Sequence, residues 1–185
     1  TLLETQLKRA KAAARLLKNM PTCTKNQALD KIADALIAHS DEILEANKKD
    51  MAHAKEVNMT KAMQDRLLFT HERIVGVSEG VKKVATLPDP IGEVMESWTR
   101  PNGLKISKVR VPIGVFGIIY EARPNVTVDI ASLCLKSGNA CVLRGGKEAI
   151  HTNKKLVEIM KDATKDILPE GAIELITELD HAIVG

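Results

Sequence analysis

The stretch "VRVPIGVFGIIYEARPNVTVDIASLCLKSGNACVLRGGKEAIHTN" occupies Val109–Asn153, and the order of its apolar runs decides the fold. The apolar run Val111–Ile119 is rich in residues that favour strands and predicts a buried strand. Residues Asn125–Lys136 predict a helix that starts after Pro124. The alternation continues with a helix stop at Ser137-Gly138-Asn139, a short buried strand at Ala140–Leu143, a helix from about Ala149 to Asp166 and a last strand at Ala172–Ile176. This order predicts an α/β fold with a Rossmann-like parallel sheet.

Two polar segments follow the first two predicted strands directly. Tyr120–Asn125 comes after the first strand, and Arg144–Glu148 comes after the second. Ligands of open parallel sheets bind outside the carboxyl ends of the strands. We therefore expect both segments at the ligand-binding edge of the sheet.

The second segment has the composition of a phosphate site. Gly145 and Gly146 let the backbone approach a ligand, the following helix N-terminus is expected to offer unpaired N–H groups, and Arg144 and Lys147 bracket the glycines with positive charge. The segment is not a Walker loop and no GxGxxG precedes it, so a standard nucleotide motif is excluded. A solvated turn with ordinary basic residues remains the alternative. RNA binding through a single Arg-Gly-Gly is disfavoured because aromatic residues, at 2% of the chain, are too few for base stacking.

The first segment places an acid, a base and an amide within five residues. In the functional interpretation, Arg123 binds an anionic substrate and a neighbouring donor stabilises a developing oxyanion. The alternative is a local Glu121–Arg123 ion pair with Asn125 as the helix N-cap.

The residues before this stretch predict a different architecture. Helical spacing of apolar residues predicts a helical segment over residues 1–96, with Ser40, Thr60 and Thr70 as expected N-caps. Asn102-Gly103 predicts the turn of a strand pair within residues 97–110, and residues 111–185 form the predicted βαβαβ core.

Composition narrows the class of protein. The chain has 185 residues, 44% of them hydrophobic, and a formal net charge of only +3, which gives no reason to expect nucleic acid as a partner. Its three cysteines form neither a disulfide framework nor, with histidine, a zinc site, so no metal is expected. No membrane span or signal peptide is found, which favours the cytoplasm. The chain starts at Thr1 rather than Met, which suggests truncation or processing.

The central stretch closely resembles the gamma-glutamyl phosphate reductase family, a branch of the aldehyde dehydrogenase superfamily. The most characteristic block is "PIGVFGIIYEARPNVTVDIASLCLKSGNACVLRGGKEAIHTN". The likeness extends upstream through "KIADAL", "ILEANKKD", "DRLLFT" and "KVRVPIG", and downstream through "LPEGAIELI". It thus covers nearly the whole chain.

The resemblance implies a reaction and a cofactor. The family reduces L-glutamate 5-phosphate with NADPH to L-glutamate 5-semialdehyde and phosphate in proline biosynthesis. By the resemblance, Ile119, Tyr120 and the segment from Arg144 through Gly145 and Gly146 to Lys147 bind the cofactor. Lys147 stands where the superfamily often has a ribose-binding Glu, which suits a 2′-phosphate. The substrate residues are expected to be Glu121, Arg123 and Asn125.

The resemblance also implies partners: a homo-oligomer assembled through the strand pair, and glutamate 5-kinase as a candidate source of the unstable acyl phosphate. The family's chemistry needs a cysteine thiolate in a downstream Thr-Cys-Asn context, which this chain lacks. No catalytic residue is therefore assigned in this chain, and we expect an incomplete cofactor domain of the aldehyde dehydrogenase type that is inactive alone. A short nucleotide-binding relative and an assembly domain remain the alternatives.

Overall fold

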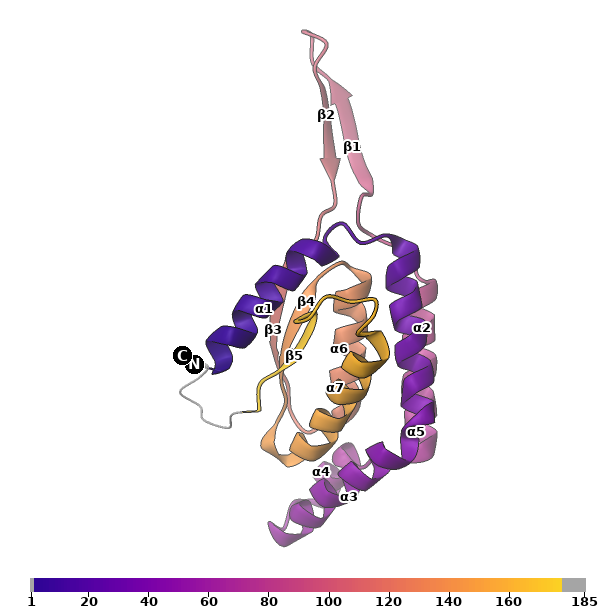
Figure 1. Cartoon of the computed structure of the whole chain (residues 1–185), viewed down its shortest axis with the longest axis vertical. Coiled ribbons are helices and arrows are strands. Elements are labelled where there is room, and N and C mark those ends of the chain that lie inside the picture. The colour runs from indigo at the N-terminus through magenta and orange to yellow at the C-terminus, as the bar shows by residue number, and fades with distance from the viewer. Residues whose placement is uncertain (1, 178–185) are drawn as a thin grey trace.

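The computed structural model describes residues 2–177 and shows a helical N-terminal segment, a projecting hairpin and a small parallel sheet (Figure 1). The helices are α1 (Leu2–Leu17), α2 (Thr22–Ala38), α3 (Ser40–Glu56), α4 (Lys61–Leu67), α5 (His71–Thr86), α6 (Pro124–Lys136) and α7 (Ile150–Thr164). The 3₁₀ turn η1 (Lys147–Ala149) precedes α7, and the strands are β1 (Val94–Thr99), β2 (Lys105–Val109), β3 (Val115–Ile119), β4 (Ala140–Arg144) and β5 (Ile173–Leu175).

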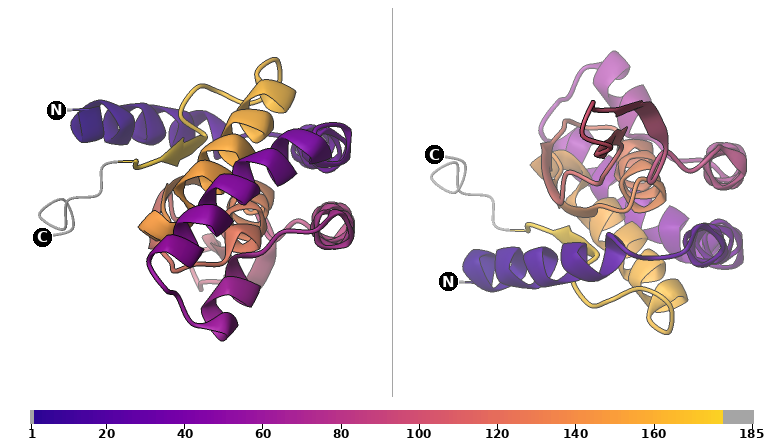
Figure 2. Two further views of the ribbon diagram at one scale, coloured as in Figure 1. Left: turned by 90° about the horizontal axis from the view of Figure 1, so that it is seen from below. Right: turned by 90° about the horizontal axis from the view of Figure 1, so that it is seen from above.

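The parallel sheet confirms the predicted alternation of strands and helices. Its order is β3-β4-β5, and β4 is paired on both sides. Helix α1 lies on one face, while α6 and α7 cover the other, with α2 and α5 packed side by side outside them (Figures 1 and 2). The core is aliphatic, and its central strand β4 is buried from Ala140 to Leu143, as predicted.

The first strand of the sheet is shorter and less buried than predicted. Pairing begins at Val115, because Pro112 has no N–H to donate and Gly114 adopts a φ of +125°. Val111 and Ile113 are exposed, and β3 is half-buried because it forms an open edge of the sheet. The prediction of a buried strand over Val111–Ile119 was therefore wrong in its extent and its burial.

Two of the three predicted helix caps are confirmed. The Thr60 hydroxyl accepts a hydrogen bond from the Met63 amide at 3.3 Å, and the Thr70 hydroxyl accepts one from the Arg73 amide at 3.2 Å. Ser40 is not a cap, because only His39 separates α2 from α3 and takes the cap position itself. Ser40 is instead the first helical residue.

The predicted strand pair forms an antiparallel hairpin that extends from the body of the molecule (Figure 1). Its turn contains Gly103 at a φ of +84°, and the Asn102 side chain accepts a hydrogen bond from the Leu104 amide at 3.2 Å. A positive φ is available to glycine at little cost, so Asn102-Gly103 is a sound turn signal.

Candidate functional site

The carboxyl ends of β3 and β4 bring the two polar segments together. Ile119 pairs with Arg144 in the parallel register, and the Tyr120 amide donates to the Arg144 carbonyl at 3.0 Å. Both segments therefore start from neighbouring strand ends, as the sequence predicted. Helices α3 and α4 lie at this same end of the sheet (Figure 1).

Beneath the glycine loop, a buried hydrogen-bond chain fixes the floor of the site. The Tyr120 hydroxyl lies 2.6 Å from the Thr127 hydroxyl, and Thr127 donates to the side-chain oxygen of Asn153 at 2.8 Å. Burial raises the pKa of Tyr120 to about 12, so the phenol is neutral at physiological pH. Tyr120 thus holds the loop through the side chains of Thr127 and Asn153.

Gly145 lies so close to a buried side chain that a larger residue would disturb it. A Cβ on Gly145 would collide with the buried Asn153 amide, whereas one on Gly146 would meet only the flexible carboxylate end of Glu148. Among the described residues, the buried Nδ2 of Asn153 has no hydrogen-bond partner. The loop is therefore a close-approach backbone cradle of the kind that a dinucleotide phosphate or ribose can use.

The helix that follows the loop does not offer all of its N–H groups. The Asp50 carboxylate of α3 accepts hydrogen bonds from the His151 and Thr152 amides at 3.1 and 2.8 Å. The expectation of an open helix N-terminus was therefore wrong, because an acidic side chain from a distant helix already caps α7. An anion at this loop is left with Lys147 and Arg144 as its cationic partners and with the glycine backbone.

Charge around the cradle is arranged unevenly. Lys147 is exposed and forms no hydrogen bond within residues 2–177, whereas Arg144 is half-buried at the end of β4. The Glu148 carboxylate lies against Gly146 and would repel a phosphate there. The residues fit an anionic cofactor on the side of Arg144 and Lys147, and Glu148 must turn away from any phosphate over Gly146.

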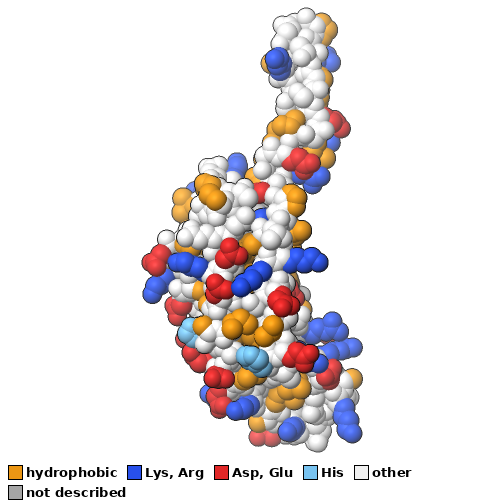
Figure 3. Space-filling model, turned by 90° about the vertical axis from the view of Figure 1, so that its right-hand side faces the viewer, with side chains coloured by type: hydrophobic (Ala, Val, Ile, Leu, Met, Phe, Trp, Pro, Cys, Tyr) orange, Lys and Arg blue, Asp and Glu red, His pale blue; other side chains and the backbone are white. Residues whose placement is uncertain are grey.

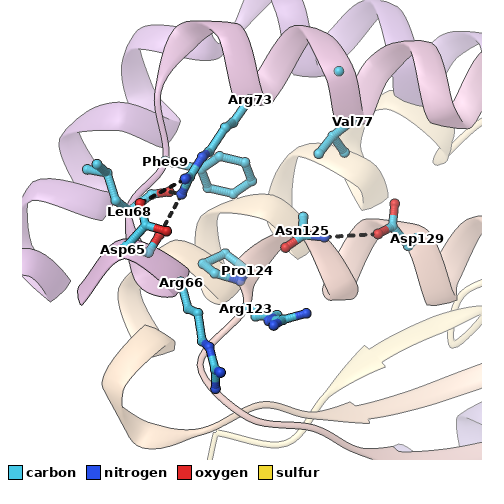
Figure 4. Close-up of a pocket in the computed structure, with 11 residues that line it drawn as sticks. Asp65, Arg66, Leu68, Phe69, Arg73, Val77, Arg123, Pro124, Asn125 and Asp129 are labelled. Carbon is cyan, nitrogen blue, oxygen red and sulfur yellow. Dashed lines mark hydrogen bonds and ion pairs between the residues drawn. The ribbon is translucent and has the colours of Figure 1, made fainter. Parts of the chain in front are cut away.

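The first polar segment opens onto two cavities. Glu121, Arg123 and Glu148 share the lining of a cavity of about 570 Å³. Arg123 and Asn125 line a second cavity, of about 470 Å³, between α6 and the α4–α5 connection (Figure 4). The structure thus places the expected substrate residues beside open volume next to the glycine loop.

The local alternative for this segment does not form. In the described part of the chain no ion pair joins Glu121 to Arg123, and Arg123 itself takes the N-cap position of α6. Asn125 lies two residues later, and its amide donates to the Asp129 carboxylate at 3.1 Å. Asn125 is therefore not the N-cap.

Sequence reasoning missed three side chains at this end of the sheet. Asp50 caps α7, Arg66 of α4 lines both cavities, and Asp129 lies in the cavity of about 470 Å³. Arg66 lies in the quoted "DRLLFT", but no local pattern links it to Arg123, 57 positions later in the chain. Only the tertiary fold brings the two arginines to one cavity.

The three cysteines lie away from the two cavities. Cys23 is exposed in the first turn of α2, and α2 begins at the end of the molecule that carries the hairpin (Figure 1). Cys134 and Cys141 are buried. Hydrogen bonding with Cys134 together with burial raises the pKa of Cys141 well above its usual value, whereas hydrogen bonding with Cys141 lowers the pKa of Cys134. A neutral buried thiol such as Cys141 is a poor nucleophile.

Within residues 2–177, no group of three or more His, Cys, Asp or Glu side chains is arranged to hold a metal ion. None of the helices over that range has the length and apolar character needed to cross a membrane.

Comparison with known proteins gives consistent results. Residues 2–184 match the model of the aldehyde dehydrogenase family. The chain is 56% identical over 168 residues to gamma-glutamyl phosphate reductase of Clostridium novyi, covering 90% of this chain and 40% of that protein. The crystal structure of gamma-glutamyl phosphate reductase from Thermotoga maritima superposes with a TM-score of 0.96 at 43% identity, covering 98% of this chain and 44% of that one. The same reductase from Saccharomyces cerevisiae gives 0.90 at 35% identity, with 97% and 47% covered. The chain spans less than half the length of the relatives it matches.

Proposed function

Because the chain belongs to the aldehyde dehydrogenase family, we propose that it is the N-terminal, cofactor-binding part of a gamma-glutamyl phosphate reductase. The observation that carries the proposal is the combination of 56% identity to one such reductase with a TM-score of 0.96 to another. The complete enzyme would reduce L-glutamate 5-phosphate to L-glutamate 5-semialdehyde and phosphate in proline biosynthesis. A catalytic domain absent from this chain would supply the cysteine nucleophile.

The family implies a nicotinamide cofactor, and we propose NADP(H) in particular. The cofactor supplies a hydride equivalent when it is bound at the carboxyl end of the sheet. Lys147 and Arg144 would bind the ribose 2′-phosphate, while Gly145 and Gly146 let the backbone approach the cofactor. Ile119 and Tyr120 would form the wall of the cofactor site at the end of β3, where Ile119 is 60% exposed and able to contact a ligand.

The substrate would bind between the cofactor loop and α6. Glu121 and Arg123 line the cavity that also reaches Glu148, the residue directly after Lys147. Arg123 is the candidate for a substrate phosphate or carboxylate, because its guanidinium is exposed and forms no hydrogen bond or ion pair within the described residues. Asn125 would act from the neighbouring cavity, where it is bonded to Asp129.

The projecting hairpin is the proposed assembly element, residues 97–110, of a homo-oligomer. The strands of the hairpin carry four exposed apolar side chains. Their exposed fractions are 56% for Val94, 47% for Met95, 44% for Trp98 and 43% for Val109. The space-filling view shows it as an arm that stands clear of the body, with hydrophobic side chains along it (Figure 3). Exposed apolar residues on a projecting arm are typical of surfaces that bind another chain.

Residues 1–96 would then support the NADPH-binding core, residues 111–185. A cytoplasmic location and an association with glutamate 5-kinase complete the proposal, since a kinase partner would shorten the path of an unstable acyl phosphate.

Complementation tests the proposed reaction. The full-length gene is expressed in a bacterial strain that lacks its own gamma-glutamyl phosphate reductase, on medium without proline. Growth that is lost with Lys147→Glu supports the proposal. A full-length protein that is produced and soluble but never restores growth would contradict it.

A further inference from the structure

The cavity of about 470 Å³ lies between the α4–α5 connection and the first turns of α6. Figure 4 shows Arg66 and Arg123 on one side of Pro124 and Asp129 on the other side of Asn125. Arg66, Arg123 and Asp129 thus line one cavity, and in the described chain neither arginine forms an ion pair with Asp129.

Asp129 carries a half-buried carboxylate that has no cationic partner among the described residues. One of its oxygens accepts a hydrogen bond from the Asn125 amide at 3.1 Å, and no Lys, Arg or His of residues 2–177 forms an ion pair with it. Burial raises the pKa of Asp129, since a carboxylate taken out of water without a cation is destabilised. A cationic ligand group in the cavity would remove that penalty.

The arginines at the cavity differ in what they already bind. Arg73 is occupied: its guanidinium donates to the Asp65 side chain at 3.0 Å and to the Leu68 carbonyl at 2.7 Å. Arg66 and Arg123 form no hydrogen bond or ion pair through their guanidinium groups within the described chain, and both also line the cavity that reaches Glu148. Two available guanidinium groups therefore lie between the cofactor loop and Asp129.

We propose that this cavity binds the α-amino-acid end of the substrate, with Asp129 receiving the ammonium group and Arg123 the carboxylate. The inference rests on the proposed function and deepens it. It assigns the two separated charges of the cavity to the recognition of the ammonium and carboxylate groups of the substrate. A carboxylate and an ammonium on one substrate suit a guanidinium at the N-cap of α6 and a carboxylate in its second turn, both lining one cavity. The reactive end of the substrate then points past Arg66 toward Glu148 and the cofactor loop.

Competitive inhibition of the full-length enzyme tests this assignment. The assay follows NADP⁺ reduction with L-glutamate 5-semialdehyde and phosphate, and it compares L-glutamate with glutarate, which has the same carbon chain but no amino group. The wild type should bind L-glutamate more tightly. Asp129→Asn should raise the inhibition constant of L-glutamate about ten- to a hundredfold, as expected for the loss of one charge-assisted contact, and leave glutarate unchanged or tighter.

Two further variants fix the interpretation. Asp65→Asn removes another carboxylate of the same cavity, one already paired with Arg73, and should keep the preference for L-glutamate. Arg123→Gln should weaken both inhibitors by similar factors. Equal weakening of both inhibitors by Asp129→Asn, or a wild type without a preference for L-glutamate, overturns the assignment alone. An enzyme that does not turn over the semialdehyde at all overturns the proposed function as well.

Discussion

The Asp50 carboxylate of α3 caps α7 by accepting hydrogen bonds from the amide and the hydroxyl of Thr152, at 2.8 and 2.6 Å. Asp50 is only 2% exposed, and the neighbouring Asn47 donates to the Leu67 carbonyl and accepts from the Phe69 amide. This buried cluster joins the helical N-terminal segment to the parallel-sheet core, and it fixes the end of the sheet where both polar segments lie.

Replacing Asp50 by Ala should destabilise the chain by about 2–4 kcal/mol, because it leaves two helix amides and a hydroxyl buried without an acceptor. Urea unfolding of the chain measures this free energy. Asp34→Ala is the matched control, since Asp34 is exposed and pairs only with exposed Lys82, so its loss should cost less than about 1 kcal/mol. Similar costs for the two variants would show that the cap contributes little.

Lys147→Glu in the full-length enzyme should weaken NADPH binding about ten- to a hundredfold and NADH binding much less, because the contact we propose for Lys147 is to the 2′-phosphate. Fluorescence titration with both cofactors measures the two dissociation constants. Lys154→Glu makes the same charge change at an exposed position in α7, after the loop. It should leave the ratio of the NADPH and NADH dissociation constants near that of the wild type. Equal losses for both cofactors with Lys147→Glu would remove this residue from the 2′-phosphate site.

Gly145→Ala should destabilise the chain by about 1–3 kcal/mol, because the added Cβ would collide with the buried Asn153 amide. Gly117→Ala is the control in β3, where a Cβ meets no atom within 4 Å and the effect should stay within about 0.5 kcal/mol. Thermal or urea unfolding distinguishes the two. An equally tolerated Gly145→Ala would mean that the loop and α7 can move apart, and the cradle would lose its physical basis.

The stability of the chain should depend on pH through Asp129. Its pKa is raised in the folded state by burial, so folding favours the protonated form. That contribution is complete below the ordinary Asp pKa of about 3.9 and is lost as pH rises through the folded value. Asp129→Asn, which is uncharged at every pH and can still accept from Asn125, should therefore be more stable than wild type at neutral pH.

The advantage of Asp129→Asn should shrink as the pH falls toward about 4, where the wild-type carboxyl becomes protonated too. Unfolding free energies of both proteins at neutral and acidic pH measure the difference. A constant difference across that range would show that this carboxyl does not titrate differently in the folded and unfolded states.

Local signals predicted most of the elements and two of the three helix caps. Thr60 and Thr70 were recognised as caps because a cap bonds within three residues, and Asn102-Gly103 revealed its turn for the same reason. Ser40 misled, since a helix pair joined by His39 alone shifts the cap by one residue.

The sequence predicted where the candidate site lies but not all of the side chains that form it. Both polar segments were correctly placed at the strand ends, because parallel strands bring their carboxyl ends to one edge. The cap from Asp50, 102 positions from Thr152, and the position of Arg66 beside Arg123 depend on how α3 and α4 pack across that edge. No periodicity within either segment carries that information.

The most direct test of the central claim, that this chain forms the cofactor-binding part and lacks the nucleophile, is a steady-state assay on the purified 185-residue chain. Phosphate-dependent oxidation of L-glutamate 5-semialdehyde by NADP⁺ is followed for the wild type and for Cys23→Ser, Cys134→Ser and Cys141→Ser. The account predicts no turnover above background for any of the four, while NADPH still binds and Lys147→Glu weakens that binding. Robust turnover that one of the three serine variants abolishes would contradict it.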